Sequence, residues 1–169
     1  MEENPLKHLW ASWRIKYIQG GTRESGCVFC KALSRSDGVE NLIVARAEHS
    51  FVILNKFPYT SGHLMVVPLE HRGSLEELTP ATRAEMMELV THFLAVLREI
   101  YAPEGFNIGI NIGNAAGAGV PGHVHIHVVP RWVGDTNFMT TVGQTRVLPE
   151  TLDDTYLRIR AAWEQKESP

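Results

Sequence analysis

Three histidines in one short run are the most distinctive chemical feature of the chain. His123, His125 and His127 alternate with apolar residues between Gly122 and Val129. Successive side chains of a β-strand point to opposite faces, so a strand through this run would place all three imidazoles on one face. A single histidine there usually serves only as the polar face of a half-exposed strand, but three in strict register favour a built site.

Two kinds of chemistry suit such a row of imidazoles. A metal ion could bind only one or two of them, because side chains at alternate strand positions spread over roughly 13 Å across the row. A metalloenzyme is also disfavoured, because no Asp or Glu stands near the row as a general base. The alternative is nucleophilic catalysis, in which one neutral imidazole nitrogen attacks while its second nitrogen is held by a hydrogen-bond acceptor.

Both cysteines of the chain lie in the tetrapeptide Cys27-Val28-Phe29-Cys30. Such a pair cannot build a disulfide framework, and in a reducing compartment it indicates half of a metal site or a redox pair. A thioredoxin-like redox pair begins a helix after a strand. Residues 20–37 are instead rich in Gly, Ser and charge, so we expect mostly loop there, with a helical turn at 31–34.

The pattern of apolar residues predicts which elements position these groups. We expect strands at 42–45, 51–54, 63–67, 106–112 and 123–129, and a glycine-rich loop at 113–122. Strands grouped around one long helix, without a βαβ alternation, predict an α+β fold with an antiparallel sheet of about five strands.

Two helices accompany the predicted strands. The long helix spans 80–100, with Thr79 as its N-cap and Pro80 at its first position. A second helix covers 151–163 near the end of the chain. The apolar stripe expected on the long helix is Ala84, Met87, Val90, Phe93, Leu94, Leu97 and Ile100, and that of the last helix is Leu152, Tyr156, Ile159 and Trp163.

Length and charge set the class of protein. The 169 residues, 44% apolar and 21% charged, predict one globular domain. A net charge of −3 gives no basic surface for nucleic acid or an anionic membrane. The acidic, interrupted start is unlike a signal peptide, and we expect a cytoplasmic protein without a spanning helix. The aromatic N-terminal segment, with Trp10, Trp13 and Tyr17, is expected to pack on the body or to form a dimer contact.

The run from Gly122 to Val129 resembles the signature of the histidine triad (HIT) superfamily of nucleotidyl hydrolases and transferases, in which three His alternate with apolar residues. The resemblance extends over most of the chain. It includes the segments 54–58, 62–68 and 111–113, and His71 followed by Leu75 and Leu78. Segments 10–17 and 131–138 are similar to the bacterial and archaeal branch related to diadenosine tetraphosphate phosphorylases and hydrolases.

The resemblance implies a HIT-like fold that pairs into a homodimer with a continuous sheet. It divides the single domain, 1–169, into an N-terminal arm with the CxxC motif (1–35), a HIT core (36–135) and a C-terminal extension (136–169). It also implies a structural zinc ion and no organic cofactor. The zinc ligands would be Cys27, Cys30, His71 and His123, a set of four that leaves no open position.

The resemblance further implies a covalent mechanism. His125 would attack the α-phosphorus of a nucleotide, His127 and His63 would line the phosphoryl oxygens, and Asn111 would donate to the phosphate. Asn55 would reach the ribose. Small residues in the loop, including Gly117, Gly119 and Gly122, would let the backbone approach a phosphate closely. Relatives with Gln followed by Ser or Thr differ here, since this chain has Gly119 and Val120.

The sequence therefore predicts a HIT-family nucleotide hydrolase or phosphorylase acting on dinucleoside polyphosphates, such as diadenosine tetraphosphate. Phosphoryl transfer needs mainly positioning and hydrogen-bond donors, so the negative net charge is no objection. Two alternatives stay open: an adenine-nucleotide-binding or scaffold protein with little turnover, and a nucleoside phosphoramidate hydrolase. For Arg131, pairing with an acid is favoured over a phosphate contact.

Overall fold

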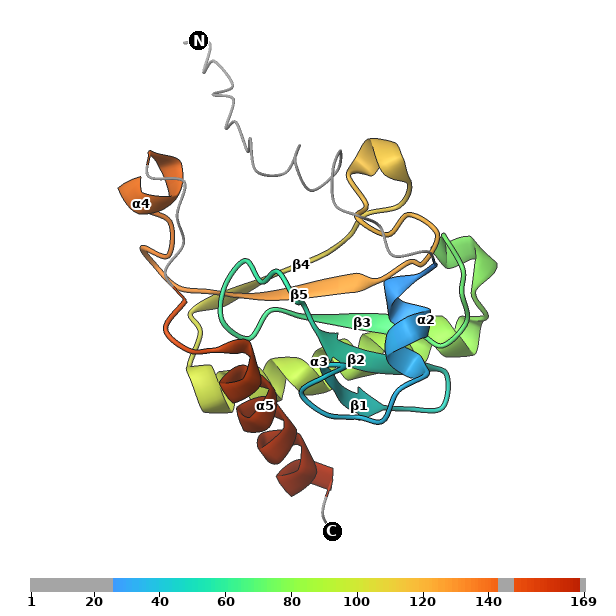
Figure 1. The fold of residues 1–169 in the computed structure, drawn as a ribbon, viewed down its shortest axis with the longest axis horizontal. Coiled ribbons are helices and arrows are strands. Elements are labelled where there is room, and N and C mark those ends of the chain that lie inside the picture. The colour runs from blue at the N-terminus through green and yellow to red at the C-terminus, as the bar shows by residue number, and fades with distance from the viewer. Residues whose placement is uncertain (1–25, 143–147, 168–169) are drawn as a thin grey trace.

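The computed structural model describes residues 26–142 and 148–167 (Figure 1). The aromatic N-terminal segment with Trp10, Trp13 and Tyr17 lies outside the described residues, so its predicted packing or dimer contact stays a prediction. Of the predicted N-terminal arm, only residues 26–35 are described, and these include both cysteines.

One antiparallel sheet forms the centre of the fold. Its strands are β1 (Ile43–Arg46), β2 (Ser50–Leu54), β3 (Leu64–Pro68), β4 (Gly105–Ile110) and β5 (Ile126–Arg131), in the spatial order β1-β2-β3-β5-β4. Every neighbouring pair is antiparallel. The predicted α+β class with five strands is thus confirmed. Because β5 lies between β3 and β4, its residue His127 is flanked by a strand on either side, paired with Met65 and Gly109.

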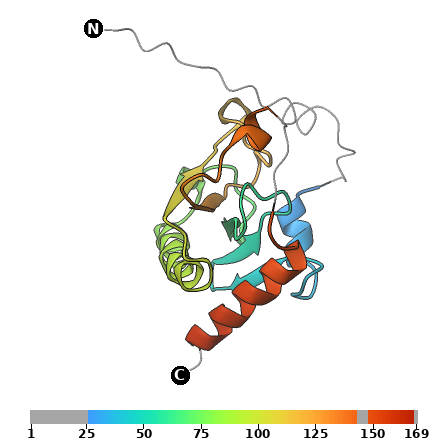
Figure 2. The same cartoon turned by 90° about the vertical axis from the view of Figure 1, so that its left-hand side faces the viewer.

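Helices cover both faces of the sheet. Figure 2 shows α2 (Val28–Leu33) and α3 (Pro80–Tyr101) on opposite sides of the strands. The C-terminal helix α5 (Leu152–Glu167) packs against α3 and β1, and the ring of its Trp163 stacks on Phe93 with centroids 4.6 Å apart. A short helix, α4 (Phe138–Thr141), follows β5. Within 26–142 and 148–167, no helix combines the length and apolar character needed to span a membrane.

The long helix begins at the predicted residue and ends at Tyr101, one residue beyond the predicted span. Thr79 caps it by accepting a hydrogen bond from Thr82 N at 3.1 Å, and Pro80 occupies the first turn. Of the expected stripe, Val90, Phe93 and Leu97 are buried, but Ala84 and Met87 are exposed.

The buried stripe of α3 is rotated by about one position from the predicted one in its first half. Thr82, Met86 and Leu89 are buried in the part of the helix where the predicted stripe has Ala84 and Met87, and Val96 is also buried. A period of 3.6 residues places Thr82, Met86 and Leu89 on one face of the helix. Whether Met86 or Met87 is buried therefore depends on which face of α3 packs against the sheet.

Residues 28–33 form a helix, so the expectation of mostly loop at 20–37 is wrong for this part. Cys27 is the N-cap residue of α2, and Phe29 is buried in the core. Ala32 and Leu33 also pack against the core, although each is only partly buried. One apolar face buried against the sheet stabilises this short helix despite the weak pattern around it.

The histidine run is only partly a strand, since β5 begins at Ile126 and not at His123. Val124 N donates instead to the carbonyl oxygen of Arg72 at 2.7 Å. The alternation nevertheless persists: Val124, Ile126 and Val128 are buried in the core. Extended backbone before the strand is therefore enough to place the three histidines on the side opposite that apolar row.

The rotated stripe of α3 gives a paired test of the fold. Met86 is 1% exposed and Met87 is 54% exposed. We expect Met86→Ala to lower the free energy of unfolding by about 2–4 kcal/mol, because it leaves a cavity in the core. The matched control Met87→Ala should change it by less than about 0.5 kcal/mol. Urea unfolding of both variants measures the difference, and equal effects would contradict the packing described.

Candidate functional site

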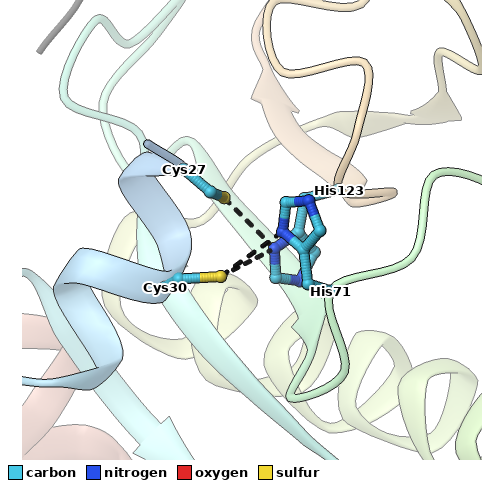
Figure 3. A group of neighbouring side chains, drawn as sticks. All are labelled: Cys27, Cys30, His71 and His123. Carbon is cyan, nitrogen blue, oxygen red and sulfur yellow. Dashed lines mark hydrogen bonds between the residues drawn. The ribbon is translucent and has the colours of Figure 1, made fainter. Parts of the chain in front are cut away.

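Four side chains from three distant segments converge at the start of α2. Figure 3 shows Cys27 and Cys30, both at the start of α2, facing the rings of His71 and His123. Cys27 Sγ lies 3.3 Å from His123 Nδ1, Cys30 Sγ lies 3.4 Å from His71 Nδ1, and Cys30 Sγ lies 3.8 Å from His123 Nδ1. The predicted ligand set is therefore brought together, with one donor atom from each residue within 4.8 Å of all the others.

The donor set fits a metal ion of the zinc type. Tetrahedral ligation with bonds of about 2.0–2.3 Å places neighbouring donors about 3.5 Å apart, close to the distances seen here. Two sulfurs and two imidazoles are donors that zinc prefers. Burial and the adjacent Cys27 thiol raise the pKa of Cys30, so a bound cation is what would favour its thiolate form. Cys27, Cys30, His71 and His123 could thus hold one metal ion.

The hydrogen bonds of His123 orient it for this role. The carbonyl oxygen of Pro68 can only accept, and it lies 2.9 Å from His123 Nε2. The Nε2–H therefore donates, and the neutral ring keeps its lone pair on Nδ1, which faces the cysteines. Burial is the main cause that lowers the pKa of His123 and so favours the neutral form.

His125 carries its ring proton on the opposite nitrogen. Its Nδ1 lies 2.8 Å from the carbonyl oxygen of His123, which can only accept. The Nδ1–H therefore donates, and the neutral ring exposes an unprotonated Nε2. Burial lowers the pKa of His125 and favours this neutral form. The arrangement gives His125 a lone pair at the outer end of its ring, which is what a nucleophile requires.

A chain of hydrogen bonds sets the protons of the next two imidazoles. Tyr59 N–H donates to His63 Nδ1 at 3.1 Å, so the neutral His63 carries its proton on Nε2. That Nε2 lies 3.0 Å from His127 Nδ1 and donates to it, which leaves the His127 proton on Nε2. The rings of His125 and His127 are 4.8 Å apart. A lone pair on His125 and an N–H donor on His127 therefore lie side by side.

Phe29 lies between two groups of side chains. One is the set Cys27, Cys30, His71 and His123, which we call the metal-ligand cluster, and the other is the pair of imidazoles of His125 and His127. Phe29 lies between the two cysteines in α2, and its ring centroid is 5.3 Å from that of His123 and 5.0 Å from that of His125. The helix that supplies both cysteines thus also packs an aromatic ring against His125. Aromatic contacts of this kind restrict the orientation of a neighbouring ring.

The predicted substrate residues occupy several places around the histidines. Asn55 lies next to His63, with Nδ2 3.4 Å from both ring nitrogens, and its Oδ1 accepts from Phe57 N at 2.9 Å. Gly117 has a φ of +80°, which favours glycine, at the end of a short helical turn. Gly119 is exposed. Gly122 packs against the metal-ligand cluster, since a Cβ there would lie 3.3 Å from His71 Nε2.

A cavity of about 330 Å³ opens beside His127, and we call it the inner cavity. Asn111 lines it together with Thr60 and residues of β4 and β5. His127, Val129 and Arg131 alternate along β5, and His127 is paired with Gly109 of β4. The inner cavity therefore runs along the histidine face of the sheet, away from His125.

Arg131 pairs with an acid, as favoured from the sequence. Its Nε lies 2.5 Å from Asp135 Oδ2 and its Nη2 lies 2.7 Å from Asp135 Oδ1. This two-point contact lowers the pKa of Asp135 to about 2. Arg131 Nη1 also donates to Asn107 Oδ1 at 2.6 Å. These bonds tie the loop after β5 to β4 and close one end of the inner cavity.

Two residues at the site were missed from the sequence. Tyr59 orients His63 through its backbone N–H, and its ring lies 4.7 Å from the ring of His63. A backbone donor carries no signal in residue type, so nothing in the sequence marks it. Phe29 does carry a signal in the sequence, because a residue between the two cysteines of a CxxC motif must lie close to the site that those cysteines form.

Comparisons with known proteins agree with this geometry. Residues 38–133 match the family model described as HIT domain. The chain is 36% identical over 170 residues to a Mycobacterium tuberculosis protein named AP-4-A phosphorylase, covering 96% of this chain and 87% of that protein. It is 32% identical over 97 residues to the asymmetrical bis(5'-nucleosyl)-tetraphosphatase of Schizosaccharomyces pombe, covering 57% of this chain and 53% of that protein.

A solved structure points to the same family. The Zn-bound histidine triad family protein from Mycobacterium smegmatis superposes with a TM-score of 0.67 at 32% identity, covering 85% of this chain and 96% of that chain. The match over residues 38–133, the identity over most of the chain and the shared fold together show that this chain belongs to the HIT domain family.

Proposed function

We propose that this chain is a nucleotidyl hydrolase or transferase that cleaves dinucleoside polyphosphates at the α-phosphate, with His125 as the nucleophile. The observation that carries the proposal is the hydrogen bond from His125 Nδ1 to the carbonyl oxygen of His123, 2.8 Å long, which leaves Nε2 unprotonated. The named activities of the Mycobacterium tuberculosis and Schizosaccharomyces pombe relatives support the same substrate class.

The first step transfers a nucleotidyl group to the protein. The lone pair on His125 Nε2 forms a bond to the α-phosphorus, and the phosphorus–oxygen bond to the remaining nucleoside polyphosphate breaks, so that this leaving group departs with the electron pair. The imidazole becomes positively charged, and the carbonyl oxygen bound to its Nδ1–H stabilises that charge. Neither an added base nor a metal is needed to deprotonate this nucleophile.

The neighbouring groups act on the phosphoryl oxygens. His127 would donate its Nε2–H, with its ring held by the hydrogen bond from His63 at 3.0 Å. Asn111 would donate an amide N–H from the wall of the inner cavity. Such preorganised donors stabilise the charge that spreads over the oxygens in the transition state. Asn55 would bind the ribose, and Gly117, Gly119 and Gly122 would let the loop approach the phosphates.

The second step returns the histidine to its neutral state. An acceptor oxygen attacks the phosphorus, the bond to His125 Nε2 breaks, and the electron pair returns to the ring. When water is the acceptor, its proton passes to the solvent. Water releases a nucleoside monophosphate, whereas orthophosphate releases a nucleoside diphosphate. The two relatives named above represent a phosphorylase and a hydrolase, so product analysis must identify the acceptor.

We also propose that the four-residue cluster binds a structural zinc ion. With four protein ligands, Cys27, Cys30, His71 and His123, no position is left open for substrate. When bound, the ion would tie α2 to the segment before β5 and so hold Phe29 against His125. The Zn-bound relative from Mycobacterium smegmatis supports this proposal.

The chain is further proposed to form a homodimer through the edge of the sheet. β4 is an edge strand, and Ile108 on it is 45% exposed. An edge strand offers unpaired backbone groups, and a second copy pairing along β4 would continue the sheet and cover this apolar side chain.

Cleavage of diadenosine tetraphosphate, with and without orthophosphate, tests the function. Product chromatography should show ADP and ATP with orthophosphate, or ATP and AMP without it. His125→Ala should retain the fold and lose activity to below about 0.1% of the starting rate, because the nucleophile is gone. His92→Ala, at an exposed position on α3, is the control and should keep full activity. Activity of more than a few per cent in the His125 variant would refute the mechanism.

Metal analysis tests the zinc proposal. Dialysed protein should contain about one equivalent of zinc, and Cys30→Ser should reduce it to below about 0.3 equivalents and lower Tm by about 5 °C, because metal binding contributes folding free energy. His49→Ala removes a histidine outside the cluster and should keep the metal. Unmodified protein with two titratable thiols and no zinc would overturn the proposal.

Light scattering tests the dimer. The protein should have twice the mass of one chain, and Ile108→Lys should shift it toward the monomer, because a charge on the edge strand opposes strand pairing. Leu157→Lys, at a 59% exposed position on α5, is the control and should leave the mass unchanged. A single-chain mass for the unmodified protein would contradict the edge-strand dimer.

A further inference from the structure

A second cavity, of about 490 Å³, adjoins the inner cavity, and we call it the outer cavity. The two share four lining residues, which are Tyr59, Thr60, Asp135 and Thr140. His127 lines the inner cavity but not the outer one, and His125 lines neither cavity. A group attached to a phosphorus between His125 and His127 could therefore extend through the inner cavity into the outer one.

The outer cavity is built largely by the C-terminal extension. Asn137, Met139, Glu150 and Arg158 line it and lie after residue 133, where the match to the HIT domain ends. The inner cavity, in contrast, is lined mainly by β4, β5 and the loop before β3. The outer cavity is therefore an addition to the shared domain.

The lining of the outer cavity suits a flat aromatic group. Tyr59, Tyr101 and Trp132 all contribute to its wall, and each is only partly buried. Aromatic side chains around one cavity are a common platform for a nucleobase, because every base has a π-face that can stack on them. The volume is within the range of cavities that hold small molecules.

One polar atom in the wall has an unmet hydrogen-bonding requirement. Ser61 Oγ is buried and, among residues 26–142 and 148–167, has no hydrogen-bond partner. Buried hydroxyl groups are nearly always paired, and an unpaired one costs free energy. Ser61 lines the outer cavity, so a rotation about its Cα–Cβ bond would let Oγ pair with a polar atom of a bound molecule.

The rest of the wall is held in place before any ligand binds. Glu150 accepts a hydrogen bond from the Tyr101 hydroxyl and another from Thr155 Oγ1 at 3.0 Å. Arg158 Nη2 lies 3.3 Å from Glu150 Oε2, and its guanidinium lies 5.5 Å from the centre of the Tyr101 ring. A preformed wall of this kind lowers the entropic cost of binding.

We propose that the outer cavity binds the second nucleoside of a dinucleoside polyphosphate, the one that leaves with the departing group. Its base would stack on the aromatic wall that includes Trp132, and one of its polar atoms would pair with Ser61 Oγ. The polyphosphate would lie in the inner cavity beside His127. This inference rests on the proposed function and makes the enzyme selective for substrates with two nucleosides.

Binding to a variant that cannot react tests the inference. In the His125→Ala background, calorimetry should show that diadenosine tetraphosphate binds about tenfold or more tightly than adenosine 5'-tetraphosphate, which lacks the second nucleoside. Adding Trp132→Leu should remove most of this difference. Adding Ser61→Ala should reduce it about fivefold, without destabilising the fold, because the hydroxyl is unpaired in the free protein. Ser36→Ala, exposed and outside the cavity, is the matched control and should change nothing.

Three outcomes would overturn the inference. The two ligands could bind equally well, Ser61→Ala and Trp132→Leu could weaken both ligands by the same factor, or neither variant could change the difference. Equal binding of the two ligands contradicts only the outer site, whereas no binding of either ligand contradicts the proposed function as well. Thermal melting of each variant shows whether a loss of binding reflects a loss of fold.

Discussion

The hydrogen bond between His125 Nδ1 and the carbonyl oxygen of His123 is the contact on which the rest of the site depends. Because a neutral imidazole has one proton, this bond decides which nitrogen can attack. In the same backbone segment, His123 carries its ring proton on the other nitrogen. Its Nε2–H donates to the carbonyl oxygen of Pro68, and its Nδ1 faces the cysteines. Alternate histidines of one extended run thus meet the requirements of two different roles, His123 as a candidate metal ligand and His125 as the proposed nucleophile.

The metal-ligand cluster and the fold support this contact from two sides. Cys27 and Cys30 begin α2, and Phe29 between them lies against the rings of His123 and His125. On the opposite side, Val124 and Ile126 are buried in the core. The run that carries the histidines therefore lies between the helix that supplies two candidate metal ligands and the apolar core. Contacts on both sides of the run suit the proposed reaction, in which catalysis would come mainly from positioning.

Much of the fold could be predicted from the sequence because its signals are local. Alternation marked the strands, Thr79 and Pro80 marked the start of α3, and the four ligand residues came together as the resemblance implied. The failures have physical reasons. The start of β5 depends on partners far away in the chain, and a shift of one residue from Met87 to Met86 depends on which line of α3 meets the sheet. The backbone donor at Tyr59 and the outer cavity arise only from tertiary packing, which no spacing encodes.

The protonation of the histidine rings is the most direct test of this account. Long-range ¹H–¹⁵N correlation spectra of the ¹⁵N-labelled protein near neutral pH distinguish the two neutral tautomers of each ring. The account predicts that His125 carries its proton on Nδ1, while His63 and His127 carry theirs on Nε2. A His125 ring protonated on Nε2, or on both nitrogens, would have no lone pair facing the substrate and would contradict the central claim.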